Sequence, residues 1–519
     1  MAKLKIYNSS LVPSGNTVLV QFNLQWDNAW KNDINCDGIW VFAKYKNNNG
    51  LWEHINLGNA SNHVFDYSDQ TPVSFSKGNS KDQFETGIWV PETKKGAFIY
   101  RTKGRGNVNL QNVQFLWKYN EAGINSIENT DIKVFGVEMV YIPEDKHFVG
   151  EPKGGHLNEK GERLAPLNCL YVYPKNGAYL VDSEKEIVID AKDGHLYCNQ
   201  DNERSRDDVP FTIPESFPKG YKSFWYMKYG LNSRQYVDFL NCLTRKQQQA
   251  HVRSDISQDN IPNYHVMTNS EEEKFRQSIV CALCNHGTTE PVEFYTYAPA
   301  RACNAIAWAD TAAFAAWSGL RPVTDFEFEK ACRGPKEAVS WECAWGSNEI
   351  GRADTFDGAD GSGDEIKIPK KGLVNACYAQ GLAPFEVAAG KTEADNPGFE
   401  GPVSCGLYEK TRHEGIPERL NDGASYYGNL ELSGNCWEPV VTFGSPEGRN
   451  YKPIHGNGSL DADGYANIET WPDKSGKGTG VRGGVYRSPN ASYLAVALRF
   501  AGCHAKADPR FNGGIRVGF

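Results

Sequence analysis

The first 135 residues contain strand and turn patterns but no convincing helix, and this constrains the fold more than any other feature. The segments TVLVQFNLQW, residues 17–26, and GIWVFAKYK, residues 38–46, alternate apolar and polar side chains with a period of two. Clusters of Asn, Asp and Gly separate such segments, as turns require. Half-buried strands of this kind pack as two facing sheets, so we expect a β-sandwich-like domain over residues 1–135.

The character of the chain changes after residue 220, where helix signals enter. The segment NSRQYVDFLNCL places Tyr236, Phe239 and Leu240 on one helical face. A second helix is predicted between the capping box Thr324-x-x-Glu327 and Gly334. Strands followed by helices predict an α+β chain.

Residues 151–205 are predicted to form a β insertion. Asn176-Gly177 and Asp193-Gly194 each stand between apolar runs, the spacing typical of two β-hairpins. The preceding stretch is rich in Gly, Pro and charged residues.

A capping box at Ser270-x-x-Glu273 predicts a helix that carries Phe275, Ile279 and Leu283 on one face. The pair Cys281 and Cys284 would lie on this helix. Because no second CxxC pair follows, buried reduced thiols are a better interpretation than zinc or redox chemistry.

Length and charge narrow the classes of protein. A chain of 519 residues exceeds the size of one hydrophobic core, so two or three domains are expected. The net charge of −9 argues against nucleic acid as a partner. The sequence shows neither the apolar run of a secretory signal nor that of a membrane span, so we expect synthesis in a cytoplasm and no membrane insertion. The 13 scattered cysteines suggest no disulfide framework.

The C-terminal segment, residues 482–519, reverses the sign of the charge. It holds only one acidic residue, Asp508, against six basic ones: Arg482, Arg487, Arg499, Lys506, Arg510 and Arg516. Glycine pairs stand near both ends, at Gly483-Gly484 and Gly513-Gly514.

Six ordered segments together resemble the formylglycine-generating enzyme (sulfatase-modifying factor) family. They are VEMVYIPEDKHFVG, FWYMKYGLNSRQYVDFLNCLT, GLRPVTDFEFEKACRG, AWGSN, ELSGNCWEP and finally RGGVYRSPN with GGIRVGF. The resemblance covers residues 137–150 and about 206–519. It implies a C-type-lectin-like domain over residues 136–519, with the β insertion inside it.

The resemblance also bears on catalysis. The oxidase members of the family carry two cysteines that bind copper, and spacing from Gly483-Gly484 lays these positions on Ser488 and Tyr493. Neither side chain supplies a thiolate, so we expect no copper and no oxidation of sulfatase cysteines. A non-catalytic protein is the preferred interpretation, and a divergent enzyme of the family is the alternative.

Within this superfamily the chain looks most like the retroelement-diversified variable proteins of phages and bacteria. That likeness implies a bacterial protein, incorporated into a virion or surface assembly through its N-terminal domain, with a homotrimer as one compatible assembly. The partner would be a cell-surface protein or glycan receptor, bound by the C-terminal segment. Aromatic and arginine side chains are enriched in such interfaces, and the candidates are Tyr486, Arg487, Asn490, Tyr493, Arg499, Phe500, His504, Arg510 and Phe511. A scaffold role is the alternative for Tyr493, which lies in a strand-like alternation, and for Arg482 and Arg516 in the family signatures.

Calcium is the one cofactor that the resemblance implies. The family pattern lays one loop site on Glu431, the carbonyls of Gly434 and Cys436, and Glu438, and a second site on Asp354. Carboxylates and carbonyls are hard-cation ligands. The alternative is that both glutamates are surface charges or core hydrogen-bonding groups.

Overall fold

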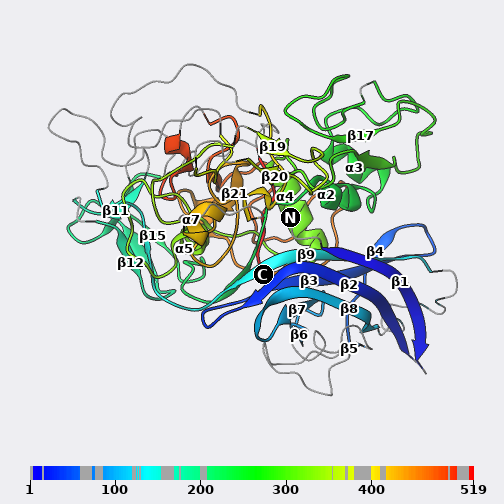
Figure 1. The fold of residues 1–519 in the computed structure, drawn as a ribbon, viewed down its shortest axis with the longest axis horizontal. Helices are drawn as coiled ribbons and strands as arrows, with labels where there is room; N and C mark the ends of the chain where they lie inside the picture. Colours follow the sequence, from blue (N-terminus) through cyan, green and yellow to red (C-terminus); the bar gives the residue numbers. More distant parts are fainter. Residues whose placement is uncertain are drawn as a thin grey trace.

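A computed structural model describes most of the chain, and the chain it shows is rich in β structure with a few short helices (Figure 1). The described residues are 4–14, 17–58, 73–75, 86–117, 119, 124, 127, 130–153, 169–174, 177–198, 207–262, 264–353, 355–368, 372–378, 399–409, 417–488, 491–499 and 513–519.

Two antiparallel sheets make up the N-terminal region. One has the strand order β1-β2-β8-β5 and consists of Lys5–Ser14, Thr17–Lys31, Gly104–Trp117 and Val73–Phe75. The other has the order β16-β9-β3-β7-β6, with β4 beside β3, and consists of Phe224–Met227, Ile132–Ile142, Asp37–Lys46, Ala97–Arg101, Thr86–Trp89 and Trp52–His54.

A shared apolar core joins these two sheets. Val20 and Phe22 of β2 are fully buried, as are Ile39 and Val41 of β3. Phe22 also packs edge-on against Phe115 of β8, with ring centroids 5.1 Å apart. The period of two therefore reports one buried face on β2, whereas the expectation of a half-buried strand is wrong for β3, whose other face buries Trp40 and Phe42 in a second core.

The second sheet continues across the expected domain boundary at residues 135 and 136. Strand β9 spans that boundary and pairs with β3 on one side and β16 on the other. The last residue of the chain is hydrogen-bonded to this sheet: the backbone N–H of Phe519 donates to the carbonyl of Trp225 in β16 over 2.9 Å. Phe98 of β7 stacks on Trp225 at 4.3 Å. The N-terminal and C-terminal regions thus share one sheet and one aromatic core.

Helices begin where local capping chemistry predicts them. Helix α2, Ser233–Leu240, starts at an Asn232 capping box and buries Tyr236, Phe239 and Leu240. Helix α5, Asp325–Arg333, starts at the Thr324 capping box and ends at Gly334. The remaining helical segments are α3, Arg245–His251; α4, Trp308–Ser318; α7, Glu418–Asp422; α8, Pro446–Arg449; and the short 3₁₀ segments η2, Leu407–Glu409, and η3, Ala491–Leu494.

Short paired strands fill the loops around these helices. They are β17, Ile279–Cys281, with β18, Phe294–Thr296; β19, Phe356–Asp357, with β20, Ile366–Lys367; and β21, Glu438–Val441, with β22, Thr479–Arg482.

The insertion has β structure, but the two predicted hairpins are wrong in their pairing. Its strands, with the flanking strands β10 and β15, are β10, His147–Val149; β11, Leu170–Val172; β12, Tyr179–Val181; β13, Ile187–Ile189; β14, Leu196–Cys198; and β15, Phe211–Ile213. Strand β11 pairs with β14, and β12 pairs with β10. Strand β13 pairs antiparallel with β15 and makes only a parallel contact with β14. Partners distant in sequence decide the pairing, whereas a turn signal is local.

The helix predicted to begin at the Ser270-x-x-Glu273 capping box is also wrong. Phe275 and Arg276 have φ angles of 56° and 54°, which a right-handed helix excludes, and Cys281 ends strand β17. The Ser270 hydroxyl donates to the Glu272 carbonyl instead of capping a helix. Cys281 is buried and Cys284 is exposed, and both are free thiols.

In the described part of the chain, no helix combines the length and the apolar character needed to cross a membrane.

Candidate binding surface of the C-terminal segment

The nine candidate ligand-contacting residues have three different outcomes. Asn490, Phe500, His504, Arg510 and Phe511 lie outside the described residues. Tyr486 and Arg499 are each 1% exposed, so the expectation that they face a ligand is wrong. Arg487 is exposed and Tyr493 is half-buried.

Contacts with helix α5 explain why two arginines of the C-terminal segment, Arg482 and Arg499, are buried. Arg499 donates to Oδ2 of Asp325 over 2.7 Å, and Arg482 donates to Oε1 of Glu329 over 2.6 Å. Asp325 and Glu329 lie four residues apart on α5, so they share a face. Each of the four side chains is 1% exposed. These arginines therefore join the tail to α5.

Arg516 follows the same pattern with another partner. Its Nε donates to Oε1 of Glu438 over 2.9 Å, and its other nitrogens donate to the carbonyls of Met227, Lys228 and Leu430. A buried guanidinium needs such partners because leaving it unpaired costs several kcal/mol, on the order of 3–5. The alternative of a scaffold role therefore fits Arg482 and Arg516. Arg499, which was expected to contact a ligand, is buried in the same way.

Tyr486 is an internal anchor that leads directly to the exposed Arg487. Its ring packs in a core cluster with Val485 and Tyr408, and burial raises the pKa of its hydroxyl. The Nδ2 of Asn304 donates to that hydroxyl over 3.4 Å and to the carbonyl of Phe275 over 2.8 Å. One buried amide therefore links the tail to the turn at Phe275.

Arg487 is the exposed member of a partly exposed group of arginine and aromatic side chains. Its guanidinium lies over the ring of Phe275, 4.9 Å from the centroid. The neighbouring Arg276 lies 5.0 Å from the ring of Phe399 and 5.5 Å from that of Phe356. All three rings are half-buried. We call these five residues, Phe275, Arg276, Phe356, Phe399 and Arg487, the arginine–aromatic surface.

The backbone beneath this surface is strained and braced. Left-handed φ angles at Phe275 and Arg276 are unfavourable for side chains of this size. Arg301, which is 3% exposed, donates to the Arg276 carbonyl over 2.7 Å. Gly401 packs so closely that an added Cβ would lie 2.5 Å from the Phe275 carbonyl oxygen. Strain that its surroundings hold in place is a feature of binding and active sites.

Acidic side chains border the surface. Asp360 accepts from Arg276 at 2.6 Å and from Arg301 at 2.8 Å, while its own side chain is 42% exposed. Sequence analysis missed Phe275, Arg276 and Asp360. In the sequence, the adjacent Phe275 and Arg276 are the feature that could have indicated this surface, but the capping box at Ser270 places them in a helix.

Comparison with protein families identifies the larger part of this chain. Residues 182–517 match the family model of the FGE-sulfatase, or sulfatase-modifying factor enzyme 1-like, domain. The chain belongs to the FGE-sulfatase family. It matches none of the curated proteins with which it was compared.

Ser488 and Tyr493, on which spacing lays the family's two thiol positions, both make contacts within the FGE-sulfatase domain. Ser488 is 1% exposed, and its hydroxyl accepts from the backbone N–H of Val485 over 2.9 Å. Tyr493 meets Trp437 edge-on, with centroids 6.3 Å apart. The serine thus closes a turn below Arg487, and the tyrosine packs on a half-buried tryptophan.

The glutamates of the expected calcium site are both buried. Oε1 of Glu431 accepts from the Gly406 N–H over 2.5 Å, and Oε1 of Glu438 is bound by Arg516. Within the described residues, Oε2 of each glutamate has no hydrogen-bond partner. Burial raises the pKa of Glu431 to about 7. It also raises the pKa of Glu438, although Arg516 opposes this shift.

These two open carboxylate oxygens fit a hard cation, with the carbonyls of Gly434 and Cys436 as further ligands. Among the described residues, no group of three or more His, Cys, Asp or Glu side chains is arranged to hold a metal. A calcium ion here would therefore depend on main-chain carbonyls. Asp354, assigned to the second site, lies outside the described residues.

Proposed function

We propose that this FGE-sulfatase-family chain is a non-catalytic binding protein that recognises a cell-surface protein or glycan through the arginine–aromatic surface. The observation that carries the proposal is Arg487, which stands exposed over Phe275 while the neighbouring Tyr486 is buried as its anchor. An arginine on an aromatic ring combines contact area with directional hydrogen bonds, a composition typical of energetic centres in interfaces.

Rigidity also favours recognition at this place. Arg301 and Asn304 hold the strained turn that presents Phe275 and Arg276, so the surface loses little conformational freedom when a partner binds. Residues that bind from a braced backbone can vary without disturbing the core. This separation suits a C-type-lectin-like domain of the retroelement-diversified kind, which is the finer family relationship that we propose.

The N-terminal strands complete the proposal as the attachment region to a phage particle or bacterial surface assembly. In Figure 1 strands β2 and β8 lie on the side of β3 and β9 that is away from the helices, whereas β1 of the same sheet approaches α2. An attachment there leaves the arginine–aromatic surface available to a receptor.

Binding of the labelled full-length chain to a glycan array and a panel of bacterial cells tests the proposal. The double variant Arg276→Ala with Arg487→Ala should lose binding by about 30-fold or more, the effect of removing about 2 kcal/mol of contact energy. Its thermal transition should stay close to that of the native chain. The matched control is Arg105→Ala, since Arg105 forms an exposed pair with Glu418. Full binding by the double variant, or no binding by the native chain to any cell or glycan, would refute the proposal.

A further inference from the structure

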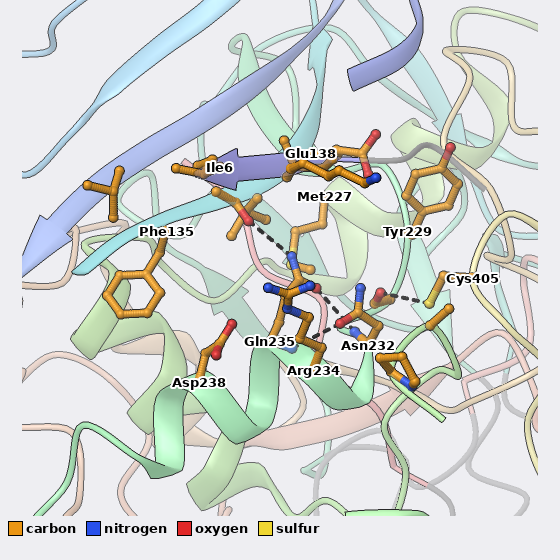
Figure 2. Close-up of a pocket in the computed structure, with 18 of the residues that line it drawn as sticks. Ile6, Phe135, Glu138, Met227, Tyr229, Asn232, Arg234, Gln235, Asp238 and Cys405 are labelled. Atoms are coloured by element: carbon orange, nitrogen blue, oxygen red, sulfur yellow. Dashed lines mark hydrogen bonds between the residues drawn. The ribbon is translucent and has the colours of Figure 1, made fainter. Parts of the chain in front are cut away.

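A cavity of about 370 Å³ lies where the N-terminal strands meet helix α2. Figure 2 shows Ile6 of β1 with Phe135 and Glu138 of β9 on one side, and Arg234, Gln235 and Asp238 of α2 on the other. The size falls within the range of about 300–1,000 Å³ that is usual for small-molecule sites. Neither the family's thiol positions nor the arginine–aromatic surface contributes to its walls.

Aromatic rings form one end of this cavity. Phe42, Phe135 and Trp317 contact one another, with centroid distances of 5.2 Å, 5.2 Å and 5.0 Å. Their faces and edges offer an apolar wall to a ligand, and the electron-rich faces also attract cations.

A carboxylate that lacks a partner stands in the wall near the other end. Glu138 has a fully buried Oε1 atom with no hydrogen-bond partner among the described residues. Lys228, whose charge acts on Glu138, is already paired with Asp37 over 3.1 Å. Tyr229 cannot serve Glu138 either, because its hydroxyl donates to Glu409 over 2.7 Å.

The charges around Glu138 leave an excess of negative charge inside. Among the described residues, Asp37, Glu138 and Glu409 interact with the ammonium of Lys228. The pKa of Glu138 is raised to about 8, mainly by burial; Glu409 and Asp37 also raise it, while Lys228 and the N-terminal amino group of the chain lower it. A carboxyl in such surroundings is stabilised as an anion by any additional cation.

The other charged residues that line the cavity differ in their exposure to solvent. Asp238 is half-buried, and burial raises its pKa. The basic lining residues, Lys5 and Arg234, are both exposed. The acids are therefore desolvated, and the bases extend to water.

We propose that this cavity binds a small organic ammonium ion, a primary amine attached to an apolar or aromatic body. The ammonium would donate to Oε1 of Glu138, and the body would lie against Phe42, Phe135 and Trp317. A neutral alcohol can donate a hydrogen bond to this oxygen but brings no charge to stabilise the ionised carboxylate, and an anionic ligand would add negative charge beside Asp37 and Glu409.

Titration calorimetry on the full-length chain provides the first test. The probes are 2-phenylethylammonium, 2-phenylethanol and 3-phenylpropionate, which share an apolar body and differ in charge. We expect the ammonium to bind at least tenfold more tightly than either of the others. Equal affinity for all three, or no binding of the ammonium at millimolar concentration, overturns the proposal.

Two variants distinguish the effect of the Glu138 charge on binding from the effect of the cavity's shape. Glu138→Gln keeps the volume of the side chain, and it should weaken ammonium binding by at least tenfold while sparing the alcohol. Gly230→Leu should abolish binding of all three probes, because a Cβ at Gly230 meets no atom within 4 Å and the new side chain has room to fill the cavity. The control is Glu337→Gln, which removes an exposed carboxylate outside the lining.

The result is independent of the proposed receptor binding. The double variant Arg276→Ala with Arg487→Ala should bind the ammonium with native affinity. Unchanged ammonium affinity in both Glu138→Gln and Gly230→Leu would show that the probe binds elsewhere and would overturn the proposal.

Discussion

Arg499 and Asp325 form a buried ion pair in which the guanidinium donates to Oδ2 over 2.7 Å and each side chain is 1% exposed. The arginine also lies 4.2 Å from the ring centroid of Phe443. By its position in the basic tail this arginine was predicted to contact a ligand. Its partner is instead the first residue of α5, so the pair fastens the tail to the domain.

The first prediction compares Arg499 with Arg487, the exposed arginine of the same C-terminal segment. Arg499→Ala should lower the free energy of unfolding by about 3–5 kcal/mol, because it leaves the Asp325 carboxylate buried and unpaired. Arg487→Ala should change it by no more than about 0.5 kcal/mol. Urea unfolding followed by tryptophan fluorescence measures both. The double variant Arg499→Ala with Asp325→Ala should be more stable than Arg499→Ala alone, and equal stability of the two single variants would contradict the assignment.

The second prediction concerns calcium. If an ion joins the open Oε2 atoms of Glu431 and Glu438, EDTA should lower the melting temperature and added calcium should restore it. The loss would be about 2.7 kcal/mol for an ion present at one hundred times its dissociation constant. Glu431→Gln should remove most of the response to EDTA, whereas Glu337→Gln should keep it. An unchanged melting temperature after chelation would leave the two glutamates as scaffold residues.

The third prediction concerns the chemistry of the family. Spacing from Gly483-Gly484 lays the family's copper-binding positions on Ser488 and Tyr493, and Ser488 is occupied in a hydrogen bond with Val485. We expect the purified chain neither to bind copper tightly nor to consume oxygen with a cysteine-containing sulfatase peptide. An oxygen electrode and mass spectrometry of the peptide provide the measurement. Copper-dependent formation of formylglycine would establish an enzyme and refute the binding function.

The fourth prediction follows from the pKa of Glu138, which burial raises from 4.5 to about 8. The folded chain therefore holds a proton that the unfolded chain has released between these two values. The contribution of this group to stability is fully present below pH 4.5 and is lost as the pH rises through about 8.

Glu138→Gln should consequently become more stable relative to the native chain as the pH rises from 5 to 8, by at most about 1.4 kcal/mol per pH unit. Above about pH 8 the difference should level off. Chemical unfolding at several pH values, with Glu337→Gln as the reference variant, measures the slope. A difference that does not depend on pH would show that Glu138 is ionised throughout.

Local chemistry explains which elements the sequence predicts correctly. The capping boxes at Asn232 and Thr324 satisfy backbone N–H groups within three residues, so α2 and α5 begin where they are expected. Alternation over strands such as β2 reports a buried face directly. At Ser270 the same type of signal fails, because Asn304 and Arg301, distant in sequence, hold the backbone in a left-handed turn that ends any helix.

By itself, the sequence determined the kinds of most elements and the ordered motifs of the FGE-sulfatase family. Only the tertiary structure decided which tail arginine faces water, since Arg499 meets Asp325 whereas Arg487 meets Phe275 at the surface. It also placed Glu138, whose Oε1 has no hydrogen-bond partner among the described residues, in a cavity formed with β1 and α2. The physical reason is that charge, burial and hydrogen bonding depend on neighbours brought together by folding, and residue type alone records none of them.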